Sequence, residues 1–443
     1  MKLILHIGTE KTGTTSTQRW AARNREALAR QGVGYSRVLG STSHVKLYLW
    51  CLAPGRKDGG FADIDACSES EQRDFRARLP DEFAAEVNEA RTSGCHTFLI
   101  SNEHCHSRLV TLEDVQRARE FLEPHFDEIE ILCSLRPQID LAVSVASNIA
   151  KGGDGITRAH FDEVRPKSPY YNHRTFVERW SASFGAERLS LVPFRRTPDF
   201  TDVVAARARI DATKLQPPVR SNEALDVRVM AMTNAIKALP IEGRWIEPFA
   251  YIPRDVLHLL PCEHRLQPGL KLARSVQGRF DESNRKLTNG RTDIGMADLE
   301  PDWSRYDAPG NLGILERPCA FSRQLAALVQ FFNQNIALAR AHNEILESER
   351  HLEWSHASVA QGRLKEAMRL LALLKQAENS SLRFRLGRLE ARAAKLAREL
   401  EPGRERPSKE HRRPGQRRRG RKQARANGKT PAPEASAGEQ DRT

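Results

Sequence analysis

Short apolar runs alternate with longer amphipathic stretches through the first two hundred residues of this chain. Four of the runs have the length of buried strands: 3–7, 95–101, 129–135 and 188–194. Three stretches between them have helical periodicity, and we expect helices near 14–30, 71–91 and 171–184. Strands that alternate with helices predict an α/β fold with a central parallel sheet.

The first apolar run leads directly into a loop of glycines, hydroxyl residues and one lysine, with the sequence Gly8-Thr9-Glu10-Lys11-Thr12-Gly13-Thr14-Thr15-Ser16. Backbone amides of such a loop, the N-terminus of the following helix and a lysine ammonium group converge on an anion. In a Walker A loop the lysine follows the second glycine, and the next Ser or Thr binds Mg²⁺. Here Lys11 precedes Gly13 by two residues. The spacing therefore predicts an anion-binding loop and argues against an ordinary NTPase.

A second anion-binding pair follows the third run. Arg136 ends the run 129–135, and Ser144 stands eight residues later on the expected helix, for which Pro137 suits the first position. Because the carboxyl ends of parallel strands open on one edge of a sheet, we expect Arg136 and the Lys11 loop to face one crevice. A guanidinium and a hydroxyl there suit a phosphate monoester. An isolated pair of this kind is also common as a surface arginine and an unrelated serine.

Candidate acid–base residues follow the second run. Glu103 comes directly after Asn102 at the end of 95–101, with His104 beside it. A carboxylate and an imidazole at this edge are candidates for acid–base chemistry, and Glu103 is the first choice. His104 is the substitute, and His6 qualifies only if its side chain points toward the sheet edge.

Glu103 and its neighbours also have structural interpretations. Glu103 instead caps the helix expected near Thr111, or pairs with Arg108. The run of Glu103, His104, Cys105 and His106 also offers metal ligands, but no second cluster stands at the spacing of a structural zinc site.

The loop resembles the 5′-phosphosulfate loop of sulfotransferases that use 3′-phosphoadenosine 5′-phosphosulfate (PAPS), especially bacterial members that begin HIGxxKTGTTxxQ. The chain matches this pattern at His6, Ile7, Gly8, Lys11, Thr12, Gly13, Thr14, Thr15 and Gln18. The family's second signature, an arginine at a strand end and a serine eight residues later for the 3′-phosphate, is matched by Arg136 and Ser144. The resemblance extends roughly over residues 1–300 and shows last at 280–284.

The resemblance implies a three-layer P-loop-like core and PAPS as co-substrate, without a metal. It implies that Lys11 stabilises the charge on the bridging oxygen of the leaving group, with Glu103 or His104 as the base. The residues expected to bind PAPS are Gly8, Lys11, Thr12, Gly13, Thr14, Thr15, Ser16, Arg136 and Ser144. The acceptor is expected to be a hydroxyl of a carbohydrate or glycolipid.

One departure from the family leaves the adenosine side of the site undefined. The run RKGxxGDWK, by which cytosolic sulfotransferases bind the 3′-phosphate from their C-terminal region, is not found. Lys151-Gly152-Gly153 is a weak substitute.

Length and composition add expectations about the number of domains, the location and the cysteines. The 443 residues, 39% of them hydrophobic, provide for about two or three domains. Neither a secretory signal nor a transmembrane span is found. Because eukaryotic Golgi sulfotransferases need a membrane anchor, the resemblance implies a cytoplasmic, bacterial protein. The seven cysteines are scattered and odd in number, which is typical of reduced thiols.

The chain changes character after the expected sulfotransferase domain at 1–315. We expect a helical region at 320–400, which offers a surface for self-association or a protein partner, or packs on the catalytic domain. One part has the spacing of a coiled-coil seam: Leu382, Leu386, Leu389, Ala393, Leu396 and Leu400. The stretch around Gly362 instead resembles a single tetratricopeptide unit.

Residues 401–443 read as a disordered basic tail, with thirteen Lys or Arg against six Asp or Glu. Over half of the chain's net charge of +13 therefore belongs to the tail, and the basic balance alone does not indicate an anionic substrate. No aromatic residues interleave with its arginines, so sequence-specific nucleic-acid binding is not expected.

The sequence thus predicts a PAPS-dependent sulfotransferase. Two alternatives stay open: a P-loop kinase of a small molecule, and a non-catalytic scaffold that binds through its helical C-terminal region.

Overall fold

A computed structural model describes residues 1–152, 154–194, 199–219, 224–238, 262–317, 320–353, 357–375 and 380–400. The predicted tail at 401–443 lies outside the described residues. The chain divides into two compact units, Met1–Arg340 with Ala372–Arg383, and Ala341–Leu371 with Phe384–Thr443. None of the six described cysteines forms a disulfide.

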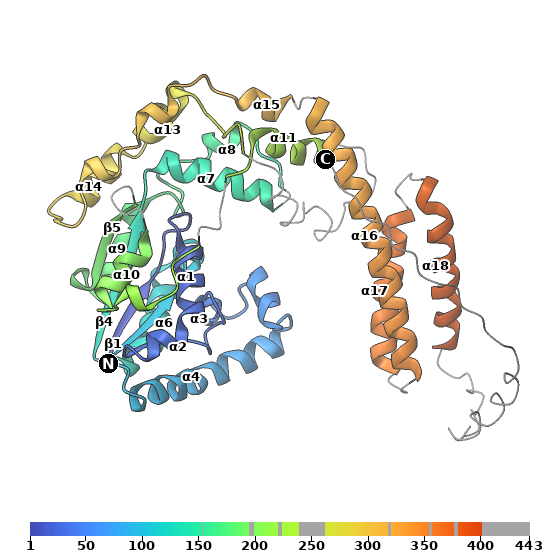
Figure 1. The fold of residues 1–443 in the computed structure, drawn as a ribbon, viewed down its shortest axis with the longest axis horizontal. Helices are drawn as coiled ribbons and strands as arrows, with labels where there is room; N and C mark the ends of the chain where they lie inside the picture. The colour runs from blue at the N-terminus through green and yellow to red at the C-terminus, as the bar shows by residue number, and fades with distance from the viewer. Residues whose placement is uncertain are drawn as a thin grey trace, which may run out of the picture. The chain divides into compact units, whose positions relative to one another are not determined.

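The first unit contains a sheet of five parallel strands in the order β2-β3-β1-β4-β5. Figure 1 labels β1, β4 and β5 of this sheet. The strands are β1 (Lys2–His6), β2 (Val33–Tyr35), β3 (Thr97–Ser101), β4 (Glu128–Leu135) and β5 (Leu189–Pro193). Central β1 pairs with β3 on one side and β4 on the other. The prediction of an α/β fold with a central parallel sheet is confirmed.

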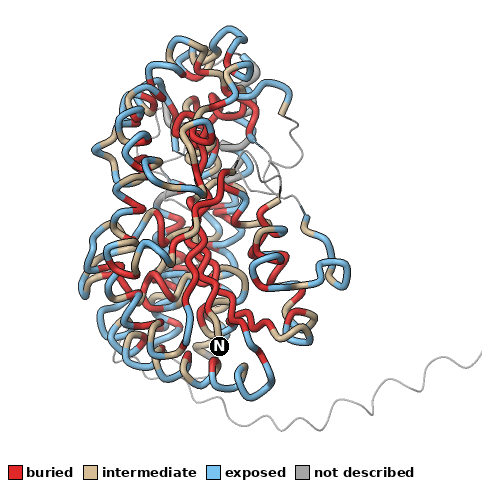
Figure 2. The backbone as a smooth tube through the Cα atoms, turned by 90° about the vertical axis from the view of Figure 1, so that its left-hand side faces the viewer, coloured by how far each residue is buried: buried red, intermediate tan, exposed pale blue. Residues whose placement is uncertain are grey.

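Helices cover both faces of the sheet. Alternate side chains of β1 point to opposite faces, because a strand has a period of two. Leu3 and Leu5 pack among apolar residues of α3 (Val45–Cys51), α4 (Glu69–Thr92), α6 (Leu112–Leu122) and α9 (His173–Phe184). Ile4 packs on the opposite side, with residues of α1 (Thr14–Arg23), α2 (Arg25–Ala29) and α10 (Phe200–Arg207). The strands consequently run through the most buried part of this unit (Figure 2).

A second apolar cluster of the first unit lies around α7, the helix that follows β4. It is built from α7 (Gln138–Lys151), α8 (Ala159–Asp162), α11 (Val227–Ala238), α13 (Leu270–Gly278) and α15 (Leu312–Glu316). Two short helices complete the elements used below, α5 (His104–Arg108) and α14 (Asp281–Thr288).

One expectation about the region after the loop is wrong, and one strand there was not predicted. The expected single helix over 14–30 breaks at Asn24, whose side-chain amide donates to the carbonyls of Trp20 and Gln216, both at 3.0 Å. The segment from 31 to Gly60 contains the edge strand β2, which the sequence did not predict. β2 has only three residues, and Phe98 lies where a side chain on Gly34 would stand.

The second unit consists of helices that pack on one another: the end of α16 (Ala320–Glu353), most of α17 (Ala357–Lys375) and α18 (Ser380–Glu399). The Ser348 hydroxyl donates to the Ala360 carbonyl at 2.7 Å, and Leu386, Ala393 and Leu396 of the predicted seam are buried. The stretch around Gly362, which resembles a tetratricopeptide unit, lies within the single helix α17. Among the described helices, we find none with the length and apolar character needed to cross a membrane.

Candidate functional site

The site is formed where three neighbouring strands end. The loop 8–13 follows central β1, Glu103 and His104 follow β3, and Arg136 follows β4. Since all strands are parallel, these segments lie at one edge of the sheet. This is the edge at which the sequence analysis places them.

Left-handed backbone conformations shape the loop. Gly8 and Gly13 have φ angles of 95° and 84°, and Lys11 has a φ of 65°, which is uncommon for a residue other than glycine. The amide and hydroxyl of Thr9 both donate to the Ser134 carbonyl, at 2.8 and 3.0 Å. Thr12 donates its hydroxyl proton to the Thr9 carbonyl at 2.6 Å. The hydroxyl of Thr12 therefore stabilises the loop itself.

The start of α1 provides amides for an anion. Gly13 is the N-cap and has no side chain that could accept from the helix, while its carbonyl accepts from the amides of Ser16 and Thr17. Among the described residues, the amides of Thr14 and Thr15 donate to no backbone carbonyl. The first amides of a helix that lack a partner, together with the helix dipole, attract negative charge.

Arg136 reaches from the end of β4 to the loop. Its Nη1 donates to the Lys11 carbonyl at 2.7 Å, and its guanidinium stacks over Phe194 at 5.0 Å. The side chain is buried, and its Nε has no hydrogen-bond partner among the described residues. Burial lowers the pKa of Arg136. A buried guanidinium with an unused donor is stabilised when an acceptor, such as a water or an anion, approaches it.

Ser144 is less well placed than Arg136. It lies half-buried about two turns into α7, and within the described part of the chain no hydrogen bond joins it to Arg136. Its neighbour Ser147 already accepts from the Leu225 amide at 3.0 Å. The assignment of Ser144 to the 3′-phosphate stays a prediction.

A second guanidinium, which sequence reasoning missed, lies near Arg136. The Arg305 Nη1 is 3.3 Å from the Oδ2 of buried Asp140, and the Oδ1 of Asp140 accepts from the Tyr306 hydroxyl at 2.6 Å. The charge of Arg305 contributes to the lowered pKa of Arg136, after burial. Arg305 follows no strand and belongs to no motif, so only the fold brings it here.

Glu103 packs against the loop. A side chain on Gly8 would stand only 3.3 Å from the Glu103 Cα, so this contact requires glycine. Glu103 accepts a hydrogen bond from the Gln18 side chain on α1. Both structural interpretations of Glu103 are wrong. Thr111 and Asp114 form the capping box of α6, and Arg108 is 3.4 Å from Asp58.

His104 pairs with a residue of the loop itself. Its Nδ1 lies 3.4 Å from Glu10 Oε1, and the Tyr170 hydroxyl donates to Glu10 Oε2 at 2.9 Å. Burial acts to raise the pKa of Glu10, but hydrogen bonds from His104 and Ser107 and the charges of His106 and His104 together outweigh it, and the pKa falls to about 2. Burial acts to lower the pKa of His104, but the hydrogen bond to Glu10 and the charges of Glu103 and Glu10 together outweigh it, and the net shift is upward. The pair therefore favours a protonated His104, which is a poor proton acceptor.

His6 does not point toward the sheet edge. Its ring stacks on Phe200 of α10 at 4.3 Å, and its Nδ1 lies 2.9 Å from the Ser101 hydroxyl. Burial lowers the pKa of His6 to about 3. The condition under which His6 would serve as the base is not met.

The run from Glu103 to His106 does not converge as a metal site. His106 is buried between the rings of Tyr170 and Phe176, at 4.8 and 5.0 Å. Among the described residues, the one group of three ligand side chains within 4.8 Å of each other is Asp226, Glu263 and His264.

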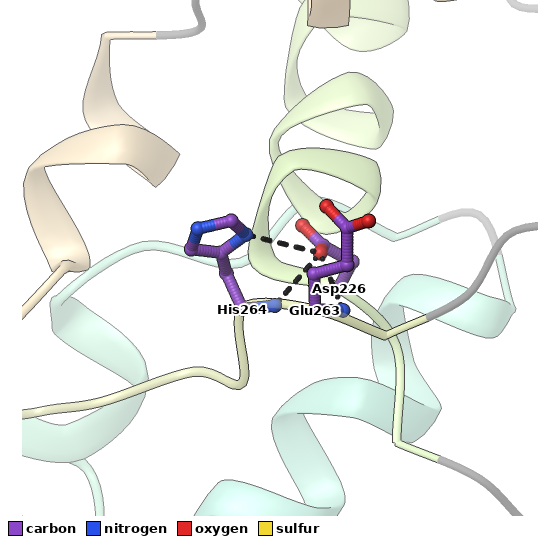
Figure 3. Close-up of side chains that lie close together, drawn as sticks. All are labelled: Asp226, Glu263 and His264. Atoms are coloured by element: carbon purple, nitrogen blue, oxygen red, sulfur yellow. Dashed lines mark hydrogen bonds and ion pairs between the residues drawn. The ribbon is translucent and has the colours of Figure 1, made fainter.

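The Asp226 group is explained by its own hydrogen bonds (Figure 3). The Asp226 Oδ1 accepts from the amide and the Nε of Arg228, both at 2.9 Å. Its Oδ2 accepts from the Arg228 Nη2 at 2.9 Å and from the amides of Glu263 and His264 at 3.1 and 2.9 Å. The Arg228 guanidinium thus already holds the position that a cation would take.

Comparison with protein families, with curated proteins and with solved structures finds no match to this chain. The functional interpretation therefore depends on the geometry described above and on the sequence motifs.

Sequence reasoning missed the partners of the predicted residues. Gln18 follows Thr14 by one helical turn. A helical projection of α1 could therefore have predicted its contact with the β3 edge. Glu10 stands inside the predicted loop, but its pairing with His104 depends on the short helix α5.

Proposed function

We propose that this protein is a PAPS-dependent sulfotransferase that transfers a sulfuryl group to a hydroxyl of a carbohydrate or glycolipid. The observation that carries the proposal is the hydrogen bond from Arg136 to the Lys11 carbonyl at 2.7 Å. It joins two anion-binding elements that are 125 residues apart in the sequence. A donor with phosphate groups at two positions needs two such elements side by side.

The residues present fit this donor. The first amides of α1 and the Lys11 ammonium group suit the phosphosulfate, and the unused Nε of buried Arg136 suits the 3′-phosphate. Lys11 would stabilise the negative charge that develops on the leaving oxygen. Glu103 would accept the proton of the attacking hydroxyl, since it lies against Gly8 of the loop.

The variant Arg136→Ala tests the donor. We expect its affinity for 3′-phosphoadenosine 5′-phosphate (PAP) to fall about 10- to 100-fold, because a charge-assisted hydrogen bond to the 3′-phosphate is lost. The affinity for adenosine 5′-phosphosulfate, which has no 3′-phosphate, should fall far less. Calorimetric titration of both ligands measures the difference.

Arg136→Lys is the matched variant, because it keeps the charge and most of the volume. It should recover part of the preference for PAP. If Arg136→Ala weakens both ligands equally, Arg136 serves only to hold the loop, and the assignment of the 3′-phosphate site is wrong.

A further inference from the structure

A basic depression lies along the exposed side of α1. It has a volume of about 510 Å³ and is lined by Arg19, Ala22, Arg23, Arg25, Ser41, Thr42 and Val219. Arg19 and Arg23 are exposed and stand four positions apart, so they project from the same face of the helix. We call this surface the α1 basic depression.

Positive charge in the depression is not balanced by its own lining. Among the described residues that line it, none is acidic and none is aromatic. Arg25 donates to the carbonyls of Tyr35, Ser36 and Ser41, at 3.0, 3.0 and 2.8 Å, and so holds the wall in place. Burial lowers the pKa of Arg25 and the charge of nearby Arg37 lowers it further, while Tyr35 and Glu86 act in the opposite direction without reversing the shift. An anion placed here would therefore meet net positive potential.

Two walls of the depression are connected by hydrogen bonds to elements that carry the candidate active site. On α1, the Ser16 hydroxyl donates to the carbonyl of Val219 at 2.9 Å, so the wall contacts the first turn after the loop. Ser41 and Thr42 lie just before His44, whose Nδ1 accepts from the Ser101 amide at 2.9 Å. Ser101 ends β3, two residues before Glu103.

The order of the strands separates the depression from the donor site. Arg136 follows β4, on one side of β1, whereas Glu103 and the segment 41–42 follow β3 and β2 on the other side. A donor held by Lys11 and Arg136 would leave the β3 and β2 side for the acceptor. The depression lies on that side.

We infer that the α1 basic depression binds an acidic saccharide, and that the acceptor carries carboxylate or sulfate groups beside the hydroxyl that reacts. The inference rests on the proposed function. Arg19 and Arg23 would bind two negative groups of the saccharide, and Ser41 and Thr42 would bind its hydroxyls. A single-stranded nucleic acid fits less well, because the described lining has no ring on which bases would stack.

The experiment is a calorimetric titration of the full-length protein with three hexamers at about 0.15 M salt. The probes are hexagalacturonate, uncharged maltohexaose and a hexamer of deoxythymidylate. We expect hexagalacturonate to bind and maltohexaose not to bind. The variant Arg19→Ala/Arg23→Ala should weaken hexagalacturonate about tenfold or more, because two charge-assisted contacts are lost.

The matched control is Arg73→Ala/Arg78→Ala, which removes two exposed arginines from helix α4. It should bind hexagalacturonate like the wild-type protein, and the basic tail is present in every variant. Equal binding by wild type and the Arg19/Arg23 variant would overturn the inference. Binding of the deoxythymidylate hexamer as tightly as hexagalacturonate would also overturn it.

Binding of PAP separates this inference from the proposed function. PAP should bind equally to the wild type and to both double variants, because none of these arginines lies at the loop. If PAP binds and hexagalacturonate does not, only the acceptor inference fails. If the wild type does not bind PAP, the proposed function fails whatever the saccharides do.

Discussion

The variant Lys11→Ala should transfer sulfate about 10² to 10³ times more slowly than the wild type while it keeps most of its affinity for PAP. The reason is that the ammonium group acts mainly on charge that develops on the leaving oxygen in the transition state, whereas the affinity for PAP also draws on the first amides of α1 and on Arg136. Transfer is measured from labelled PAPS to the best acceptor in a panel of saccharides and glycolipids.

Lys11→Gly is the control that separates charge from backbone strain. Lys11 has a φ of 65°, a conformation that glycine adopts without strain. The glycine variant should therefore be at least as stable as the alanine variant and equally slow. Undiminished transfer in either variant would contradict the role of Lys11. Slow transfer in the alanine variant alone would show that the lost charge is not the cause.

The variant Glu103→Gln should lower kcat by about 10² to 10⁴ with little change in PAP affinity. Glutamine keeps the shape of the side chain and its hydrogen-bonding capacity toward Gln18, but it cannot accept a proton. His104→Ala should be the milder change, because Glu10 already raises the pKa of His104 and favours its protonated form. Steady-state rates with a saturating donor measure both.

Glu120→Gln, at an exposed position of α6, is the matched control and should leave kcat unchanged. If Glu103→Gln stays active and His104→Ala is inactive, the histidine is the base and the carboxylate only positions it. If neither variant is slow, the base is a group that this account does not include, since His6 stacks on Phe200 away from the edge.

The sequence predicted the parts of the fold in which local pattern and tertiary structure agree. The runs that became β1, β3, β4 and β5 are apolar on both faces, as strands between two helix layers must be. β2 has only three residues and includes Gly34, so no alternation marks it. The break at Asn24 depends on Gln216, which is remote in sequence and invisible to a local pattern.

In the candidate site, the sequence likewise predicted the contacts that follow from strand order but not those that depend on side-chain directions. Lys11 and Arg136 were expected to meet because each follows a parallel strand, and the structure places them in hydrogen-bond contact. The pairing of Glu10 with His104 and the approach of Arg305 depend on side-chain directions in short helical segments. Strand order alone does not determine those directions.

The most direct test of the central claim is thermal unfolding of the full-length protein with nucleotides, in the presence of a metal chelator. PAP at about 100 times its Kd should stabilise the first unit by about 2.7 kcal/mol and raise its Tm by several degrees, because it binds the folded state alone. ADP, which has no 3′-phosphate, should have a much smaller effect with or without Mg²⁺. Stabilisation by ADP only when Mg²⁺ is present, with none by PAP, would contradict the sulfotransferase assignment and favour a kinase.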